Sequence, residues 1–240
     1  MTITERGVAV ITGATGGVGR AIARRLAGAG MNVCVTARAQ ESLEALVTER
    51  AWDGHVEGFI VDLADEAAIR GFCERIGHQY SSVHVLVHAA GIIEMGSVAE
   101  SRLEDFDRQH QINVRAPYQL TQALLPNLAR GRGQVVFVNS SAGVSAREQV
   151  AQYAATKHAL KAVADSLRAE VNARGIRVLS VFLGRTASRM QREVHLREGK
   201  PYDPDRLLQP DSVASVVVNA LELPRTAEVT DIHIRPMLKS

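Results

Sequence analysis

Tyr153 and Lys157 lie four residues apart in the segment Tyr-Ala-Ala-Thr-Lys, and Ser140 lies 13 residues before the tyrosine. On a helix, positions i and i+4 share one face, so the phenol and the ammonium group can point into the same space. A nearby cation lowers the pKa of a tyrosine, which makes the phenol a usable general acid or base. The spacing also fits a surface helix with a half-buried tyrosine and a solvated lysine. A glycine-rich turn near residue 13 favours the catalytic interpretation, because it predicts a nucleotide in the same molecule.

This turn reads Thr-Gly-Ala-Thr-Gly-Gly-Val-Gly at residues 12–19 and lies between an apolar run and a segment of helical period. Glycine permits a tight turn and lets the backbone approach a pyrophosphate, while the next helix offers free N–H groups and its positive dipole end. The position between a strand and a helix is what makes such a turn a nucleotide-binding loop. The predicted cofactor-binding residues here are Gly13, Thr15, Gly16, Gly17, Val18 and Gly19.

The second apolar run ends in Thr-Ala-Arg at residues 36–38. An NAD-preferring site usually has an acidic residue at the end of this strand, where it binds the ribose 2′-hydroxyl. Ala37 occupies that position, and Arg38 can pair with a 2′-phosphate. The sequence therefore predicts a preference for NADP(H), with NAD(H) possible. The alternative is an ordinary exposed arginine at the start of a loop.

Short apolar runs alternate with longer segments of helical period along the chain. The runs are rich in valine and isoleucine, which suits strands buried on both faces of a parallel sheet. The alternation predicts an α/β fold with a doubly wound, mostly parallel, seven-stranded Rossmann-type sheet and helices on both faces. The expected strands are Val8–Thr12, Asn32–Ala37, Val56–Val61, Val83–Val87, Gln134–Val138, Arg177–Phe182 and Val229–Ile234. The expected helices are Val18–Gly30, Leu43–Arg50, Glu66–His78, Leu103–Leu128, Gln152–Arg174 and Asp211–Leu221.

No linker or shift in composition divides the 240 residues, so we predict one domain over residues 1–240. The polar and charged segment Arg185–Gln209 breaks the alternation after the sixth strand. It falls at the carboxyl end of the sheet, where ligands bind in open α/β folds. It is either a solvated connection with a short helix or a mobile lid over substrate, and the two are compatible.

Composition excludes several classes of function. The formal net charge is only +2 and the charges are dispersed, which argues against nucleic acid as a partner. No apolar stretch approaches the ~20 residues of a membrane span, and the first residues lack the pattern of a signal peptide. Cys34 and Cys73 are predicted to be reduced core thiols of a cytoplasmic protein. The eight scattered histidines predict no metal site.

The chain resembles the short-chain dehydrogenase/reductase family along essentially its whole length, because several independent motifs occur in the family's order. The matching segments are residues 12–19, Val-Asp-Leu at 61–63, Gln-Ile-Asn-Val at 111–114, Asn-Ser-Ser-Ala-Gly at 139–143 and Tyr-Ala-Ala-Thr-Lys at 153–157. The family's Ser-x-x-Gly pattern and the 13-residue interval select Ser140 over Ser141. The resemblance implies a catalytic set of Asn113, Ser140, Tyr153 and Lys157.

The resemblance also implies cofactor contacts after the other strands. Asp62 would hydrogen-bond the adenine, and Leu63 would line its pocket. Ser188 stands where a threonine often contacts the nicotinamide carboxamide, with Thr186 as the alternative. The full set implied here is Asp62, Leu63, Ala89, Ala90, Gly91, Tyr153, Lys157, Gly184, Thr186 and Ser188.

Two segments depart from the family pattern. The Asn-Asn-Ala-Gly expected after the fourth strand reads His-Ala-Ala-Gly at residues 88–91, so His88 is expected to be a structural histidine beneath the cofactor. The Pro-Gly expected after the sixth strand reads Leu183-Gly184, which frees the backbone at the start of the lid.

The activity that the resemblance implies is hydride transfer between a nicotinamide and a carbonyl or secondary alcohol, with a ketone or aldehyde reductase favoured. Tyr153 would donate the proton, Ser140 would hold the same oxygen, Lys157 would bind the ribose and lower the Tyr153 pKa, and Asn113 would hold a water. One alternative is a dinucleotide-binding, redox-sensing regulator without turnover, since fold alone does not separate the two. Another is an epimerase or dehydratase that uses the same tyrosine and lysine with retained NAD, but such relatives usually carry a longer substrate domain, for which 240 residues leave little room.

Substrate contacts are expected from Ala142–Val150, Ile92–Gly96 and the lid after Gly184. Family members often pair the long helices that correspond to residues 103–128 and 152–174, which implies a homodimer or homotetramer. Packing of these helices against the sheet alone is the alternative.

Overall fold

Within the described residues, seven parallel strands form one sheet in the order β3-β2-β1-β4-β5-β6-β7. The structure is a computed structural model that describes residues 7–48, 52 and 54–238. The doubly wound, Rossmann-type sheet predicted from the alternation is confirmed, and every strand pair is parallel. The strands are β1 (Val8–Thr12), β2 (Asn32–Ala37), β3 (Val56–Ile60), β4 (Val85–His88), β5 (Gln134–Ser140), β6 (Arg177–Leu183) and β7 (Asp231–Ile234).

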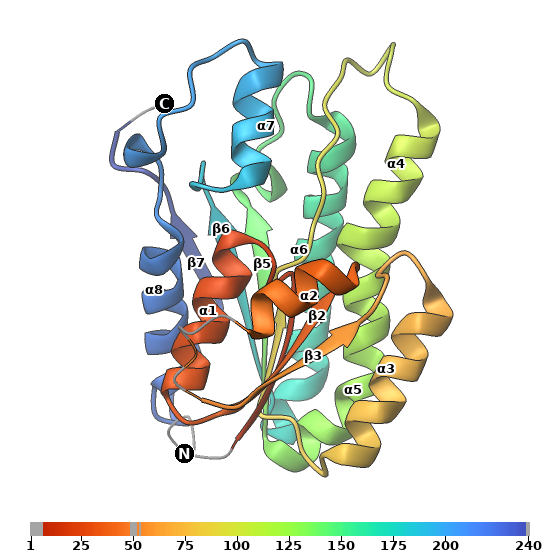
Figure 1. The fold of residues 1–240 in the computed structure, drawn as a ribbon, viewed down its shortest axis with the longest axis vertical. Helices are drawn as coiled ribbons and strands as arrows, with labels where there is room; N and C mark the ends of the chain where they lie inside the picture. Colours follow the sequence, from red (N-terminus) through yellow and green to blue (C-terminus); the bar gives the residue numbers. More distant parts are fainter. Residues whose placement is uncertain (1–6, 49–51, 53, 239–240) are drawn as a thin grey trace.

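Helices cover both faces of the sheet (Figure 1). One core joins the sheet to α1 (Gly17–Gly28), α2 (Gln40–Val47) and α8 (Pro210–Glu222). The other core joins it to α3 (Glu66–Gln79), α5 (Ala116–Gly131) and α6 (Ala151–Val171). Strand residues alternate between the two cores, which is why the strands read as continuous apolar runs in the sequence.

Strands β1 and β4 are neighbours at the centre of the sheet, and Thr12 lies in register with His88. The chain leaves β1 toward β2 on one side and returns from β3 to β4 on the other. The order of the strands therefore reverses at this pair, and ligands bind at the carboxyl ends beside such a switch point. The glycine-rich turn follows β1 at this position.

The segment expected to be one helix, Leu103–Leu128, is divided into three parts. An α-helix, α4 (Leu103–His110), is followed by a π-helical segment, η1 (Gln111–Arg115), and then by α5. Pro117 at the start of α5 explains the break, because it has no N–H to donate to the Asn113 carbonyl four residues earlier. Single π turns inside α-helices often mark functional sites, and this one contains Asn113.

The polar segment after β6 is ordered around α7 (Arg189–Arg197), which stands at the carboxyl end of the sheet (Figure 1). The Nη2 atom of Arg185 lies 2.8 and 2.7 Å from the two carboxylate oxygens of Glu198. A short β-bridge also joins Thr186 to Leu208, and a 3-10 turn covers Pro204–Arg206. The short helix expected in this segment is confirmed, and whether the segment moves as a lid stays a prediction.

Other element boundaries differ by a few residues. Helix α2 begins three residues before the expected Leu43 and ends at Val47, and the last two residues of that expected helix, 49 and 50, lie outside the described residues. Residues 1–6 and 239–240 of the predicted single domain also lie outside them. Strands β5 and β6 run further than expected because their ladder continues to the pair Ser140 and Leu183. None of the helices in the described part of the chain has the length and hydropathy needed to cross a membrane.

Candidate active site

Ser140, Tyr153 and Lys157 come together where β5 ends and α6 begins. Ser140 is the last residue of β5, and its hydroxyl accepts a 3.2 Å hydrogen bond from the Ala142 backbone N–H. The same hydroxyl lies near the Tyr153 phenol and acts to lower the pKa of that phenol. Tyr153 and Lys157 lie on the first turns of α6, so the helical spacing read from the sequence puts both on the face toward β5.

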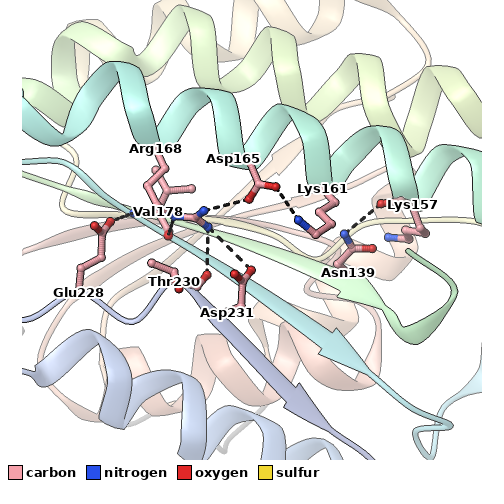
Figure 2. Close-up of polar contacts among 9 residues, drawn as sticks. All are labelled: Asn139, Lys157, Lys161, Asp165, Arg168, Val178, Glu228, Thr230 and Asp231. Atoms are coloured by element: carbon pink, nitrogen blue, oxygen red, sulfur yellow. Dashed lines mark hydrogen bonds and ion pairs between the residues drawn. The ribbon is translucent and has the colours of Figure 1, made fainter. Parts of the chain in front are cut away.

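Lys157 is buried, and its Nζ donates a 3.2 Å hydrogen bond to the Val138 carbonyl. The side chain of Asn139 holds the same stretch of α6 from the strand side. Its Nδ2 donates to the Lys157 carbonyl at 3.1 Å (Figure 2). Its Oδ1 accepts from the Ser140 N–H at 2.8 Å. One buried amide therefore ties Ser140 and the turn of α6 that contains Lys157 to the same strand end.

Helix α6 is held against the sheet along its length (Figure 2). Arg168, about four turns beyond Tyr153, donates to the Val178 carbonyl on β6 and to the Thr230 carbonyl before β7, both at 3.0 Å. The carboxylate of Asp165 accepts hydrogen bonds from Arg168 Nη1 at 2.9 Å and from Lys161 Nζ at 2.6 Å. The Arg168 contacts hold the C-terminal half of α6, and Asn139 holds the turn around Lys157. Together they fix the position of the helix that carries Tyr153 and Lys157.

Asn113 is fully buried in the π-helical segment, next to Lys157. Its Oδ1 accepts from the Ile92 N–H at 2.9 Å, and its Nδ2 donates to the Ile92 carbonyl at 2.9 Å and to the Thr156 hydroxyl at 3.1 Å. A β-carbon at Gly91 would lie 3.2 Å from Asn113 Oδ1 and 3.7 Å from Lys157 Nζ. Glycine at position 91 thus leaves room between these two polar atoms.

The glycine-rich turn has the close packing that its sequence predicts. Gly13 has a φ of +74°, and a β-carbon there would lie 2.5 Å from the Ala90 nitrogen, so no larger residue fits. A β-carbon at Gly19 would lie 2.4 Å from the Gly13 carbonyl oxygen. Helix α1 begins directly at the turn, and its first turn contains no acidic residue. Its free N–H groups can therefore donate hydrogen bonds to an anion such as a pyrophosphate.

The remaining predicted cofactor contacts lie at the carboxyl ends of the other strands. Ala89 and Ala90 follow β4 and pack against Gly13. Arg38 follows β2 and is exposed, and its guanidinium makes no hydrogen bond or ion pair with any other residue that the structure describes. Asp62 and Leu63 follow β3, and Asp62 Oδ1 accepts from the Ala64 N–H at 2.9 Å.

Gly184, Thr186 and Ser188 follow β6 and lead into α7. The Ser188 hydroxyl caps α7 by accepting from the Gln191 N–H at 3.1 Å, and it donates to the Thr186 carbonyl at the same distance. The Thr186 hydroxyl donates to the Gly184 carbonyl at 3.0 Å. Both hydroxyls are thus used within the segment, and neither is favoured over the other as a ligand.

A family model described as short chain dehydrogenase matches residues 7–199. The chain belongs to the short-chain dehydrogenase/reductase family. A short-chain type dehydrogenase/reductase of Sinorhizobium fredii is 32% identical over 234 residues, which are 95% of this chain and 91% of that protein. The family assignment makes the chain an NAD(P)-dependent oxidoreductase.

Solved structures agree with this assignment. An alcohol dehydrogenase of the archaeon Thermococcus sibiricus, complexed with 5-hydroxy-NADP, is 25% identical with a TM-score of 0.88, covering 98% of this chain and 99% of that one. A metagenomic short-chain oxidoreductase in complex with NADP is 28% identical with a TM-score of 0.84, covering 99% of this chain and 100% of that one.

His88 is where this member departs from the family's Asn-Asn-Ala-Gly. The imidazole is buried, its Nε2 lies 2.8 Å from the Thr121 hydroxyl, and its ring stacks on Phe137 with centroids 5.0 Å apart. Its Nδ1 has no hydrogen-bond partner, and burial lowers the His88 pKa to about 3. A neutral ring packed between β4 and α5 fits the structural role expected for it.

The electrostatics of the tyrosine–lysine pair differ from the expectation. Burial raises the pKa of Tyr153 to about 12, and the neighbouring Ser140 hydroxyl opposes that rise. Burial also lowers the pKa of Lys157 to about 8. The expected lowering of the Tyr153 pKa by Lys157 is wrong for this structure. The ammonium group instead donates to the Val138 carbonyl and lies 5.8 Å from the centre of the phenol ring.

Two polar residues of the site were not singled out from the sequence. Asn139 and Thr156 lie inside the motif segments around Ser140 and Tyr153 and are almost fully buried. A polar residue at the end of an apolar strand was the available signal for Asn139. For Thr156, which bonds Asn113, no local signal exists, because that contact joins residues 43 positions apart. Among the described residues, no cluster of histidine, cysteine and carboxylate side chains could hold a metal ion.

Proposed function

We propose that this protein is an NADP(H)-dependent reductase that transfers a hydride to the carbonyl carbon of a ketone or aldehyde. The observation that carries the proposal is the grouping of Ser140 and Tyr153 beside the buried Lys157, where the end of β5 meets the start of α6. This group lies at the same edge of the sheet as the glycine-rich turn. A proton donor and a nucleotide loop at one edge of the sheet are what carbonyl reduction requires.

In the proposed mechanism, the bound nicotinamide supplies the hydride. Tyr153 donates its proton to the substrate oxygen as negative charge develops there, and Ser140 hydrogen-bonds the same oxygen and holds it in place. Lys157, whose pKa of about 8 keeps it mainly protonated at neutral pH, binds the ribose hydroxyls. Asn113 holds a water that returns a proton through Lys157, and Gly91 supports this by leaving room between the two side chains.

The preference for NADP(H) is proposed from the end of β2. Ala37 stands where an acidic residue would bind an unphosphorylated ribose, and the exposed Arg38 can pair with a 2′-phosphate. The two solved relatives named above support the proposal, since their structures contain NADP or 5-hydroxy-NADP. The other residues proposed to contact the cofactor are those placed at the strand ends, Asp62, Leu63, Ala89, Ala90, Gly91, Gly184, Thr186 and Ser188.

Arg38→Asp is expected to shift the ratio of kcat/KM for NADPH to kcat/KM for NADH about 10- to 100-fold toward NADH, because a hydrogen-bonded charge pair contributes about 1.5–3 kcal/mol. The shift is measured by steady-state kinetics with both cofactors. Arg174→Asp makes the same charge change at the opposite end of the sheet and should leave the ratio unchanged. An unchanged ratio in Arg38→Asp shows that Arg38 does not recognise the 2′-phosphate.

The reaction itself is tested by following NADPH consumption with a panel of ketones, aldehydes and diketones. Turnover of at least one class supports the reductase. Tight NADPH binding without turnover of any panel member contradicts it and favours the redox-sensing regulator. A retained cofactor with no net consumption would favour an epimerase or dehydratase.

A further inference from the structure

Glu94, in the segment after β4, is a point where several parts of the active-site edge meet. Its carboxylate Oε2 lies 2.7 Å from Arg197 Nη1 at the end of α7. Its backbone N–H donates a 3.0 Å hydrogen bond to Gln109 Oε1 on α4. Two residues further, the Gly96 N–H donates to the Gln149 carbonyl at 2.9 Å. The segment is thus bound to the proposed lid on one side and to α4 on the other.

Gln109 continues this set of contacts toward Tyr153. It is fully buried, and its Nε2 donates a 3.1 Å hydrogen bond to Gln152 Oε1. Gln152 directly precedes Tyr153 at the start of α6, and its own Nε2 donates to the Arg102 carbonyl at 2.9 Å. A continuous path of hydrogen bonds therefore leads from Arg197 on α7 to the residue beside the proposed proton donor.

The two ends of this path set the orientation of both amides. The Glu94 N–H can only donate, so Gln109 must present its oxygen there and its NH₂ group to Gln152. The Arg102 carbonyl can only accept, so Gln152 must present its NH₂ group there and its oxygen to Gln109. Turning over either amide would break two hydrogen bonds at once. A buried polar side chain with only one such arrangement specifies a unique geometry, whereas an apolar residue would merely fill the space.

We propose that Gln109 is a positioning residue that couples the placement of α7 to the placement of Tyr153. The Arg197–Glu94 ion pair is partly exposed and therefore weak enough to open and close. When it closes, it draws in the backbone of the Glu94 segment, and Gln109 passes that displacement to the first turns of α6 through Gln152. The consequence for catalysis rests on the reductase function proposed above, while the coupling itself does not.

Amide hydrogen exchange tests the coupling without any substrate, because exchange reports local opening of hydrogen bonds. Gln109→Met keeps the length of the side chain and removes both hydrogen bonds. It is expected to speed exchange of the amides of residues 92–96 and of residues 154–157. Arg197→Met should speed exchange in both segments when Gln109 is present, but only in residues 92–96 when it is combined with Gln109→Met.

Two further variants keep this test decisive. Gln152→Met removes the same Gln109–Gln152 bond, together with the bond to the Arg102 carbonyl, from a half-exposed position, so it should reproduce the effect on residues 154–157 even if Gln109→Met folds poorly. Gln119→Met is the matched control, since it removes a 2.9 Å bond to the Glu66 carbonyl on another face of the protein and should change neither segment. The coupling is wrong if Gln152→Met leaves residues 154–157 unchanged, or if Arg197→Met affects them equally with and without Gln109.

Kinetics separate positioning from general support of the fold. Gln109→Met and Gln152→Met are each expected to lower kcat about 10-fold, because small displacements of a catalytic group cost rate, while the Kd for NADPH stays unchanged. The double variant should be no slower than the slower single variant. A rise in the Kd for NADPH, or losses that multiply, would mean a merely structural role. If the wild-type protein reduces no carbonyl, the reductase proposal fails, and the exchange experiment still decides the coupling.

Discussion

Tyr153→Phe is expected to lower kcat for carbonyl reduction about 10²- to 10⁴-fold, the range that a positioned general acid contributes. The substitution removes only the phenol oxygen, and the ring can keep its place beside Lys157. Binding of NADPH should therefore remain close to that of the wild-type protein. Burial raises the pKa of Tyr153 to about 12, which keeps the phenol protonated at neutral pH, and the protonated form is the one that donates in the direction of reduction.

The measurement is kcat by NADPH consumption together with the Kd for NADPH by fluorescence titration. Tyr118→Phe is the matched control, because Tyr118 is an exposed tyrosine on α5 and its loss should leave both quantities unchanged. Near-normal turnover in Tyr153→Phe would remove Tyr153 from the mechanism. Loss of NADPH binding in the same variant would instead mean that the tyrosine acts by holding the cofactor.

Much of this site can be predicted from the sequence because its chemistry is local in the chain. The spacing of Tyr153 and Lys157 needs only a helix to bring the two side chains to one face. The place of Gly13 in a nucleotide-binding turn can be predicted from the strand before it and the helix after it. Its close approach to Ala90 explains why glycine is required there. The same holds for the doubly wound parallel sheet, since alternating buried strands and helices leave few ways to wind one.

Features that depend on packing could not be predicted in this way. The π-helical segment around Asn113 keeps nearly the same apolar periodicity as an α-helix, and Pro117 was its one local cue. The rise in the Tyr153 pKa is set by burial, which spacing does not report. The contact of Gln109 with Gln152 joins residues 43 positions apart, so no pattern in the sequence indicates it.

The buried His88 leads to a second large expected effect, on stability in acid. In the folded protein burial lowers its pKa to about 3, against 6.5 for a free histidine, so the folded state does not take up a proton that the unfolded chain binds. The full stability is present above the unfolded pKa and falls as the pH drops from there toward 3. This single group should cost about 3 kcal/mol of unfolding free energy between about pH 7.5 and about pH 4.5.

His88→Asn, which restores the family's residue, is expected to remove this contribution. Urea unfolding at several pH values measures it, because the difference in unfolding free energy between wild type and variant cancels the other titrating groups. The difference should shift by about 3 kcal/mol in favour of the variant between about pH 7.5 and about pH 4.5. His88→Gln should show the same shift, even if the loss of ring stacking on Phe137 makes both variants less stable at neutral pH. A difference that stays constant with pH would mean that His88 takes up its proton in the folded state, and the Thr121 hydroxyl would then be accepting from a charged imidazolium.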